Sequence, residues 1–151
     1  MVRTAVASAL ALSLALPALL AQEEKAGADR LKGIYTIVRG EKDGKVIPAE
    51  RIKGSVVTFT EKKVYGTDKD RKEVFAASYT LDTSRKPWVI HMTSGGPKKT
   101  EKADGIIEVD GDTLRVCYAL PGGKTPTSFK AGQKQHCFVL KRGVTAPPKK
   151  P

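Results

Sequence analysis

The sequence predicts an all-β domain whose antiparallel strands form a sandwich or a barrel. Turn signals recur about every ten residues, and the runs between them are rich in Val, Ile, Thr, Phe and Tyr. No helical period is long enough for a crossover helix, which disfavours parallel pairing. The eight expected strands cover residues 34–39, 55–61, 63–67, 74–81, 88–93, 105–109, 113–120 and 136–141.

The chain divides into one patterned domain between two unpatterned ends. Residues 1–21 contain Arg3 followed by an uncharged Ala- and Leu-rich run, which is typical of a secretory signal peptide cleaved near Ala21. We expect residues 22–32 to be a flexible linker, residues 33–142 to be the β domain, and residues 143–151 to be a disordered tail rich in Pro and Lys.

The same N-terminal run predicts where the protein resides. Its apolar part is shorter than the roughly 20 residues that a spanning helix needs, and acidic residues follow it. We therefore expect an exported protein, periplasmic or secreted, with no transmembrane segment after cleavage. An uncleaved membrane anchor is the alternative.

The charge of the chain limits the kinds of binding partner that the sequence supports. The 151 residues carry a formal net charge of +11, but lysine is scattered and no dense basic run is flanked by aromatic residues. Such a lysine coat attracts polyanions weakly and non-specifically, and a nucleic-acid site would need exposed aromatic platforms. The sequence thus favours a solvated surface with a weak, non-specific polyanion contact, a true nucleic-acid or acidic-polymer site is the alternative, and we expect a monomer.

Two Asp-Gly pairs and one long link stand between the predicted strands. Asp110-Gly111 should supply the two positive-φ positions of a type I′ hairpin, and Asp43-Gly44 has the same pattern. The nearby carboxylates lack the ligand spacing of a known calcium loop, so we expect no metal. Residues 121–135 should form an ordered loop, held by Phe129, that covers one end of a barrel; a functional loop is the alternative.

Cys117 and Cys137 are the only cysteines. The register that matches the apolar faces of the last two strands places them opposite each other, at a Cβ separation of about 4.5–5.5 Å. A disulfide needs a Cβ separation of about 3.5–4.5 Å, and local twisting of the strands can close the difference. In an oxidising exported setting we expect a structural disulfide, and two free, half-buried thiols are the alternative. The same register pairs Leu114 with Leu140, Val116 with Phe138, and Tyr118 with His136.

The histidines and cysteines do not predict catalysis. Consecutive strand residues point to opposite faces, so His136 and Cys137 cannot easily share a zinc ion with His91. No Ser-His-Asp or Cys-His signature is present, although the sequence leaves a carboxylate pair open. We expect no catalytic residues, no metal and no cofactor, and we predict that the protein is not an enzyme.

The sequence of the C-terminal half resembles that of a known family. Residues 105–130, GIIEVDGDTLRVCYALPGGKTPTSFK, followed by FVLKR at 138–142, are similar to a lipocalin-like domain family of unknown function that is abundant in exported planctomycete proteins. The resemblance implies a calycin-type, up-and-down, eight-stranded antiparallel barrel without an established activity. The chain has Thr125 where an arginine is expected, which weakens any role of this loop in gripping an anion.

The resemblance also implies how one end of the barrel closes. In the wider lipocalin pattern, a Gly-x-Trp on the first strand is covered by a basic residue from the end of the last strand. Gly33, Tyr35 and Arg142 take these positions, with tyrosine in place of tryptophan. An arginine over an aromatic ring contributes about 0.5–2 kcal/mol as a cation–π contact.

The leading functional hypothesis is a binding module for a small apolar or amphipathic ligand, as in lipocalins by resemblance. An eight-stranded barrel has room inside only for side chains or for one small ligand, so core packing is the competing role of its inward side chains. A non-enzymatic cell-envelope protein that uses its basic surface against anionic partners is the alternative function. The candidate ligand-binding residues are Tyr35, Phe59, Tyr79, Tyr118 and Phe138.

Overall fold

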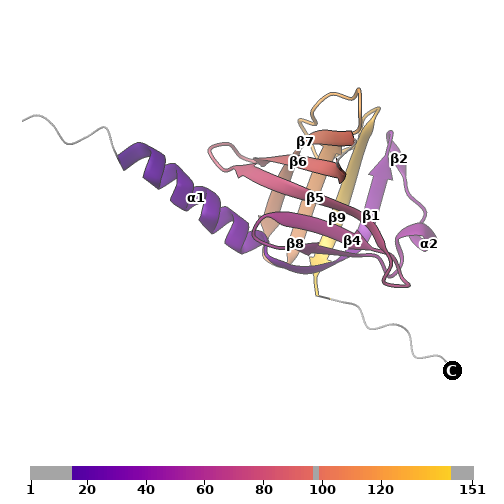
Figure 1. Cartoon of the computed structure of the whole chain (residues 1–151). Coiled ribbons are helices and arrows are strands. Elements are labelled where there is room, and N and C mark those ends of the chain that lie inside the picture. Colours follow the sequence, from indigo (N-terminus) through magenta and orange to yellow (C-terminus); the bar gives the residue numbers. More distant parts are fainter. Residues whose placement is uncertain (1–14, 97–98, 144–151) are drawn as a thin grey trace, which may run out of the picture.

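The barrel closes because its first strand pairs along both edges. The computed structural model describes residues 15–96 and 99–143. Strand β1 (Gly33–Lys42) pairs with β3 (Val56–Phe59) on one side and with β9 (Gln135–Arg142) on the other. Between them, each strand pairs with the next in antiparallel order (Figure 1): β4 (Lys63–Thr67), β5 (Glu73–Asp82), β6 (Trp88–Gly96), β7 (Lys99–Asp110) and β8 (Thr113–Ala119). The predicted all-β, eight-stranded antiparallel barrel is confirmed.

Two short elements at the far end of β1 add to the predicted strands. Strand β2 (Lys45–Val46) pairs with the end of β1, and helix α2 (Ala49–Ile52) follows it. Strands β6 and β7 also extend well beyond their predicted ends, pairing as far as Gly96 with Lys99. The polar residues at the start of β7 lack the alternation that identifies a half-buried strand, so the sequence did not predict this extension.

A helix replaces the expected linker over most of residues 22–32. Helix α1 (Ala15–Leu31) projects from the barrel and contacts it with its C-terminal end (Figure 1). Ala28 and Leu31 are buried against the core, while Asp29 and Lys32 form an ion pair of 2.8 Å on the exposed side. The flexible-linker prediction is thus wrong, because this polar stretch is rich in helix-forming Ala, Glu, Gln and Lys and buries two apolar side chains.

Aromatic rings fill the barrel at the end that α1 covers. The Phe59 ring makes edge-to-face contacts with Tyr35 and Tyr79, at centroid distances of 5.9 and 5.6 Å. Both hydroxyls donate to backbone carbonyls, Tyr35 to Leu31 at 2.7 Å and Tyr79 to Thr60 at 2.6 Å. These buried polar groups are therefore satisfied, and this end of the barrel is a packed core.

Arg142 joins the last strand to the end of α1. Its guanidinium carbon lies 4.8 Å from the centre of the Tyr35 ring, as the lipocalin resemblance implies. Two of its nitrogens donate to the carbonyls of Lys32 and Arg30, at 2.8 and 2.9 Å. One side chain thus stacks on the core and satisfies carbonyls at the helix C-terminus, which have no partner within the helix.

The two Asp-Gly turns differ from each other. Asp43 and Gly44 both have positive φ, at 52° and 78°, as the two central residues of a type I′ hairpin require. In the other hairpin Asp110 pairs with Thr113, so the central residues are Gly111 and Asp112 and only Gly111 has positive φ. The type I′ prediction for Asp110-Gly111 is wrong, because Asp110 ends the strand instead of entering the turn.

The disulfide lies on the outer face of the barrel, in the predicted register. Cys117 is bonded to Cys137, and the neighbouring pairs of β8 and β9 match the predicted register. The long loop packs Phe129 and Ala131 against this bond and Ile106, forming a small cluster apart from the main core. This part of the loop therefore covers the wall of the barrel instead of one end of it, because the cysteines and Ile106 point outward.

Replacing both cysteines with alanine should lower the free energy of unfolding by about 3 kcal/mol, because the bond spans 20 residues and restricts the unfolded chain. Guanidinium unfolding of the wild type and the double variant measures this difference. Phe129→Ala is the matched control: it removes the covering ring and keeps the bond. Reductant should destabilise the wild type and Phe129→Ala but not the double variant, and a wild type insensitive to reductant would contradict the crosslink.

Arg142→Ala should lower the free energy of unfolding by about 2 kcal/mol, through loss of the ring contact and of two charged hydrogen bonds. Arg142→Lys should retain only part of this stabilisation, since an ammonium cannot both stack on Tyr35 and reach both carbonyls. Arg39→Ala, which removes an exposed ion pair with Glu41, is the control and should cost about 0–1 kcal/mol. Equal losses for Arg142→Ala and Arg39→Ala in urea unfolding would refute this closure.

Candidate ligand-binding cup

The barrel holds a cavity of about 460 Å³ at the end opposite α1. We call this cavity the cup. Its volume falls within the roughly 300–1,000 Å³ of ligand pockets. The core is dense at the α1 end and gives way to this space toward β2 and α2.

Apolar side chains form the floor and much of the wall of the cup. Phe59, Val116 and Leu140 are buried in the core and also line the cup. Ala77 and Met92 are half-buried on the neighbouring strands β5 and β6 and also line it. Desolvating such a surface favours an apolar guest, since each square ångström removed from water contributes about 25 cal/mol.

Three aromatic rings from β8 and β9 form one wall. Tyr118 and Phe138 are stacked at a centroid distance of 6.4 Å, and His136 meets Tyr118 and Phe138 edge-on at 5.5 and 5.6 Å. The Phe138 ring lies over Gly40 of β1, where a Cβ atom would come within 2.9 Å of it. Strand alternation places all three rings inside, because the disulfide residues between them point outward.

A tyrosine–histidine hydrogen bond is the principal polar feature of this wall. The Tyr118 hydroxyl lies 3.0 Å from His136 Nδ1. Burial raises the pKa of Tyr118 to about 12, so the phenol keeps its proton. Burial, assisted by the charge of Lys42, lowers the pKa of His136 below its usual value, and Asp43 opposes this shift in part. The pair is therefore neutral at pH 7, and its two groups share one hydrogen bond.

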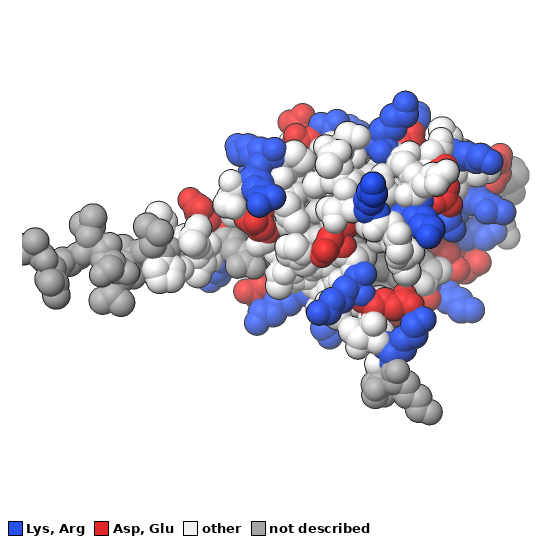
Figure 2. All heavy atoms as spheres, turned by 90° about the horizontal axis from the view of Figure 1, so that it is seen from above, with Lys and Arg blue, Asp and Glu red and all other residues white. Residues whose placement is uncertain are grey.

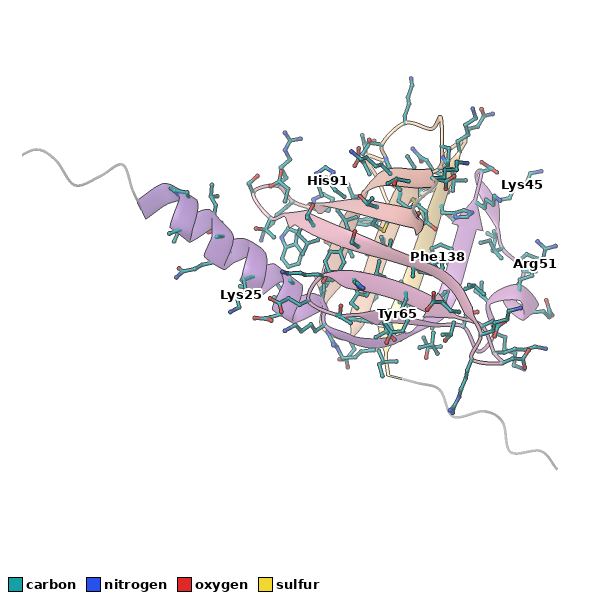
Figure 3. All side chains as sticks on the ribbon, in the orientation of Figure 1. Lys25, Lys45, Arg51, Tyr65, His91 and Phe138 are labelled. Atoms are coloured by element: carbon teal, nitrogen blue, oxygen red, sulfur yellow. A yellow bond between two sulfur atoms is a disulfide. The ribbon has the colours of Figure 1, made fainter. Side chains whose placement is uncertain are left out.

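The rim of the cup mixes charged and apolar side chains. The charged residues that line the cup are two cations, Arg51 of α2 and Lys102 of β7, and one carboxylate, Glu101. Val74 and Phe75 of β5 also line the cup, with exposed fractions of 61% and 43%. Figure 3 shows Phe138 within the barrel and Arg51 at its α2 end. On the face seen in Figure 2, Lys and Arg side chains are spread among acidic ones instead of forming one basic patch.

The structure separates the five predicted ligand-binding residues into two groups. Phe59, Tyr118 and Phe138 line the cup. Tyr35 and Tyr79 belong to the packed end, where their hydroxyls bond to the backbone. Alternation identifies inward residues but not the depth at which the core becomes a cavity. The sequence therefore missed many of the lining residues, Ala77 and Met92 among them, and the polar role of His136.

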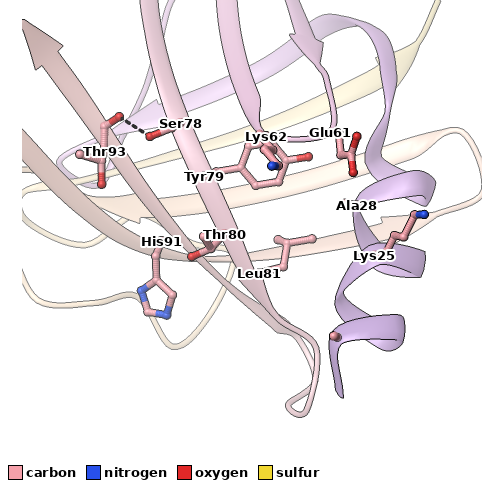
Figure 4. A pocket seen from close by; sticks show the side chains of 11 residues that line it. Lys25, Ala28, Glu61, Lys62, Ser78, Tyr79, Thr80, Leu81, His91 and Thr93 are labelled. Atoms are coloured by element: carbon pink, nitrogen blue, oxygen red, sulfur yellow. Dashed lines mark hydrogen bonds between the residues drawn. The ribbon is translucent and has the colours of Figure 1, made fainter. Parts of the chain in front are cut away.

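A second hollow, of about 470 Å³, lies between α1 and strands β5 and β6. Figure 4 shows Lys25 and Ala28 of the helix across from the strand that carries Tyr79, Thr80 and Leu81. Ala21, the residue at the predicted cleavage position, forms part of its wall, so processing there would alter this hollow. The cup, in contrast, contains no residue of α1: it is lined by barrel strands, by the α2 segment and by Leu120 and Pro121 after β8.

Some classes of site are not found in the described part of the chain. Residues 15–96 and 99–143 contain no group of three or more His, Cys, Asp or Glu side chains placed to hold a metal ion. Among the helices within these residues, none combines the length and the apolar character needed to cross a bilayer. His91 of β6 pairs with Asp104 at 2.7 Å, and both side chains are exposed.

Stability should fall as the pH is lowered through the usual pKa of histidine, about 6.5, because the unfolded chain then takes up a proton that the folded state resists at His136. The loss should be complete below the lowered pKa of the folded state. Urea unfolding at about pH 7.5 and about pH 5.5 measures it. His136→Phe should remove this contribution and His91→Gln should keep it; an unchanged pH dependence in His136→Phe would be the contrary result.

Comparison of the chain with protein-family models, with curated proteins and with solved structures finds no match. The functional interpretation depends on the cup: an apolar cavity, one aromatic wall with a neutral polar pair, and a predominantly cationic rim.

Proposed function

We propose that the protein is a non-enzymatic binding module that holds one small apolar or amphipathic molecule in the cup. The observation that carries this proposal is the cavity of about 460 Å³ inside the barrel. An eight-stranded barrel can be filled by side chains or can hold one small ligand. Here the large side chains fill the α1 end, and small ones such as Ala77 and Ala103 leave space at the other.

The chemistry of the lining supports an amphipathic guest. The floor is apolar and favours a hydrocarbon body, whereas the aromatic wall offers one hydrogen-bonding pair. A cavity with mainly apolar walls and a few fixed polar groups is the usual form of a small-molecule site. The polar groups then set the orientation of the ligand, while the apolar area supplies most of the binding free energy.

We also propose that the protein acts after export, as a member of the lipocalin-like family that its sequence resembles. The disulfide supports an oxidising compartment, because such bonds persist in secreted and periplasmic proteins and are rare in the cytosol. The apolar N-terminal run is the second support, since it has the pattern of a signal peptide.

Ala77→Phe should weaken binding of Nile red, a neutral apolar dye, by about tenfold or more, because the added ring occupies the cup. Thr80→Phe is the matched control, since it adds the same ring to the same strand at an exposed residue that borders the α1 hollow. Fluorescence titration gives both affinities, and thermal unfolding checks that the variants are folded.

The outcomes of this titration distinguish the possible binding sites for the dye. Loss of binding in Ala77→Phe alone supports the cup. Loss in Thr80→Phe alone would move the site to the hollow beside α1, and a wild type that binds neither Nile red nor other apolar dyes would reject the binding module.

A further inference from the structure

One hydrogen-bonding atom of the cup wall has no partner. His136 Nε2 is buried and makes no hydrogen bond within the described residues, whereas the other ring nitrogen, Nδ1, lies 3.0 Å from the Tyr118 hydroxyl. Buried polar atoms in folded proteins nearly always have a partner, and an exception calls for a specific explanation. His136 is one of the residues that line the cup, and a bound molecule that displaces the side chains covering Nε2 can supply that partner.

The neighbouring tyrosine determines that this atom is a donor. Within the described residues, Nδ1 is the acceptor available to the Tyr118 hydroxyl, so the phenol proton is satisfied only in the tautomer in which the phenol donates to Nδ1 and the neutral imidazole carries its single hydrogen on the other nitrogen. Nε2 therefore bears the hydrogen and needs an acceptor. The Tyr118 contact also fixes the orientation of the imidazole ring, as second partners of histidine commonly do.

The charges around the pair favour an oxygen with partial or full negative charge. Lys42 lies opposite His136 in the β1–β9 register, next to Asp43. At the rim, Arg51 and Lys102 outnumber the single carboxylate of Glu101. Nε2 is also screened from bulk water, and hydrogen bonds in such surroundings are stronger than in water.

We propose that the ligand of the cup has an apolar body and a carbonyl-type oxygen, and that this oxygen accepts a hydrogen bond from His136 Nε2. This inference depends on the proposed function, because it assumes that the cup is the binding site. A carboxylate and a neutral ketone or ester share the required acceptor. A hydrocarbon of the same size leaves the donor unsatisfied, and sites with a buried polar group discriminate strongly against ligands that lack its partner.

Three probes of similar size test this chemistry: hexylbenzene, hexanophenone and 6-phenylhexanoate. Displacement of Nile red measures their affinities for the wild type, His136→Phe, His136→Gln and Tyr118→Phe. The wild type should bind hexanophenone about tenfold more tightly than hexylbenzene, the ratio that one buried hydrogen bond provides. In His136→Phe this ratio should fall to about one, since the ring is kept and the donor is removed.

Two variants separate hydrogen bonding from shape. His136→Gln retains an amide donor and should keep part of the preference for the carbonyl probe. Tyr118→Phe frees Nδ1, so the imidazole hydrogen is no longer confined to Nε2, and the preference should fall by about half or more. Comparing 6-phenylhexanoate with hexanophenone then distinguishes a carboxylate from a neutral carbonyl as the natural group.

The results that overturn the inference differ from those that overturn the binding function. Equal affinities of the wild type for hexylbenzene and hexanophenone, or a carbonyl preference that persists in His136→Phe, would reject the hydrogen bond while leaving the cup as an apolar site. Failure of the wild type to bind any probe or Nile red would reject the binding function and this inference together.

Discussion

The double pairing of β1 is the constraint on which the rest of the structure depends. The start of this strand bonds to β3, nearly its whole length bonds to β9, and a register shift between Ile37 and Arg39 bends it between the two partners. Without this bend the sheet would have two free edges, and exposed edges invite pairing with other chains. Closure also fixes which side chains point inward, and so it determines both the core and the cup.

The inside of the barrel changes character along its axis. At the α1 end, three aromatic rings and Leu31 fill the section, and Arg142 ties the helix to the last strand. At the other end, alanines on β5 and β7 face the aromatic wall and leave space. The packed half supplies the stability that an open half requires, because the cup forgoes the contacts that a filled core would make.

Strand positions and register were readable from the sequence because they depend on local periodicity. The β8–β9 register follows from matching apolar faces, and it correctly paired the cysteines and Tyr118 with His136. Helix α1 was missed because, among its described side chains, only Ala28 and Leu31 are buried, and they lie in a polar stretch. Whether an inward residue belongs to the core or to the cup depends on its position along the barrel axis, which the alternation of side chains does not encode.

The disulfide has a consequence for the inside of the barrel. Cys117 precedes Tyr118 and Cys137 follows His136, so each half of the hydrogen-bonded pair is joined through its backbone to one end of the crosslink. The covalent bond holds the two Cα atoms 4.0 Å apart on the outer face, directly behind the two inward rings. The crosslink on the outer face and the hydrogen-bonded pair on the inner face thus restrain the same two neighbouring stretches of β8 and β9 from opposite sides of the sheet.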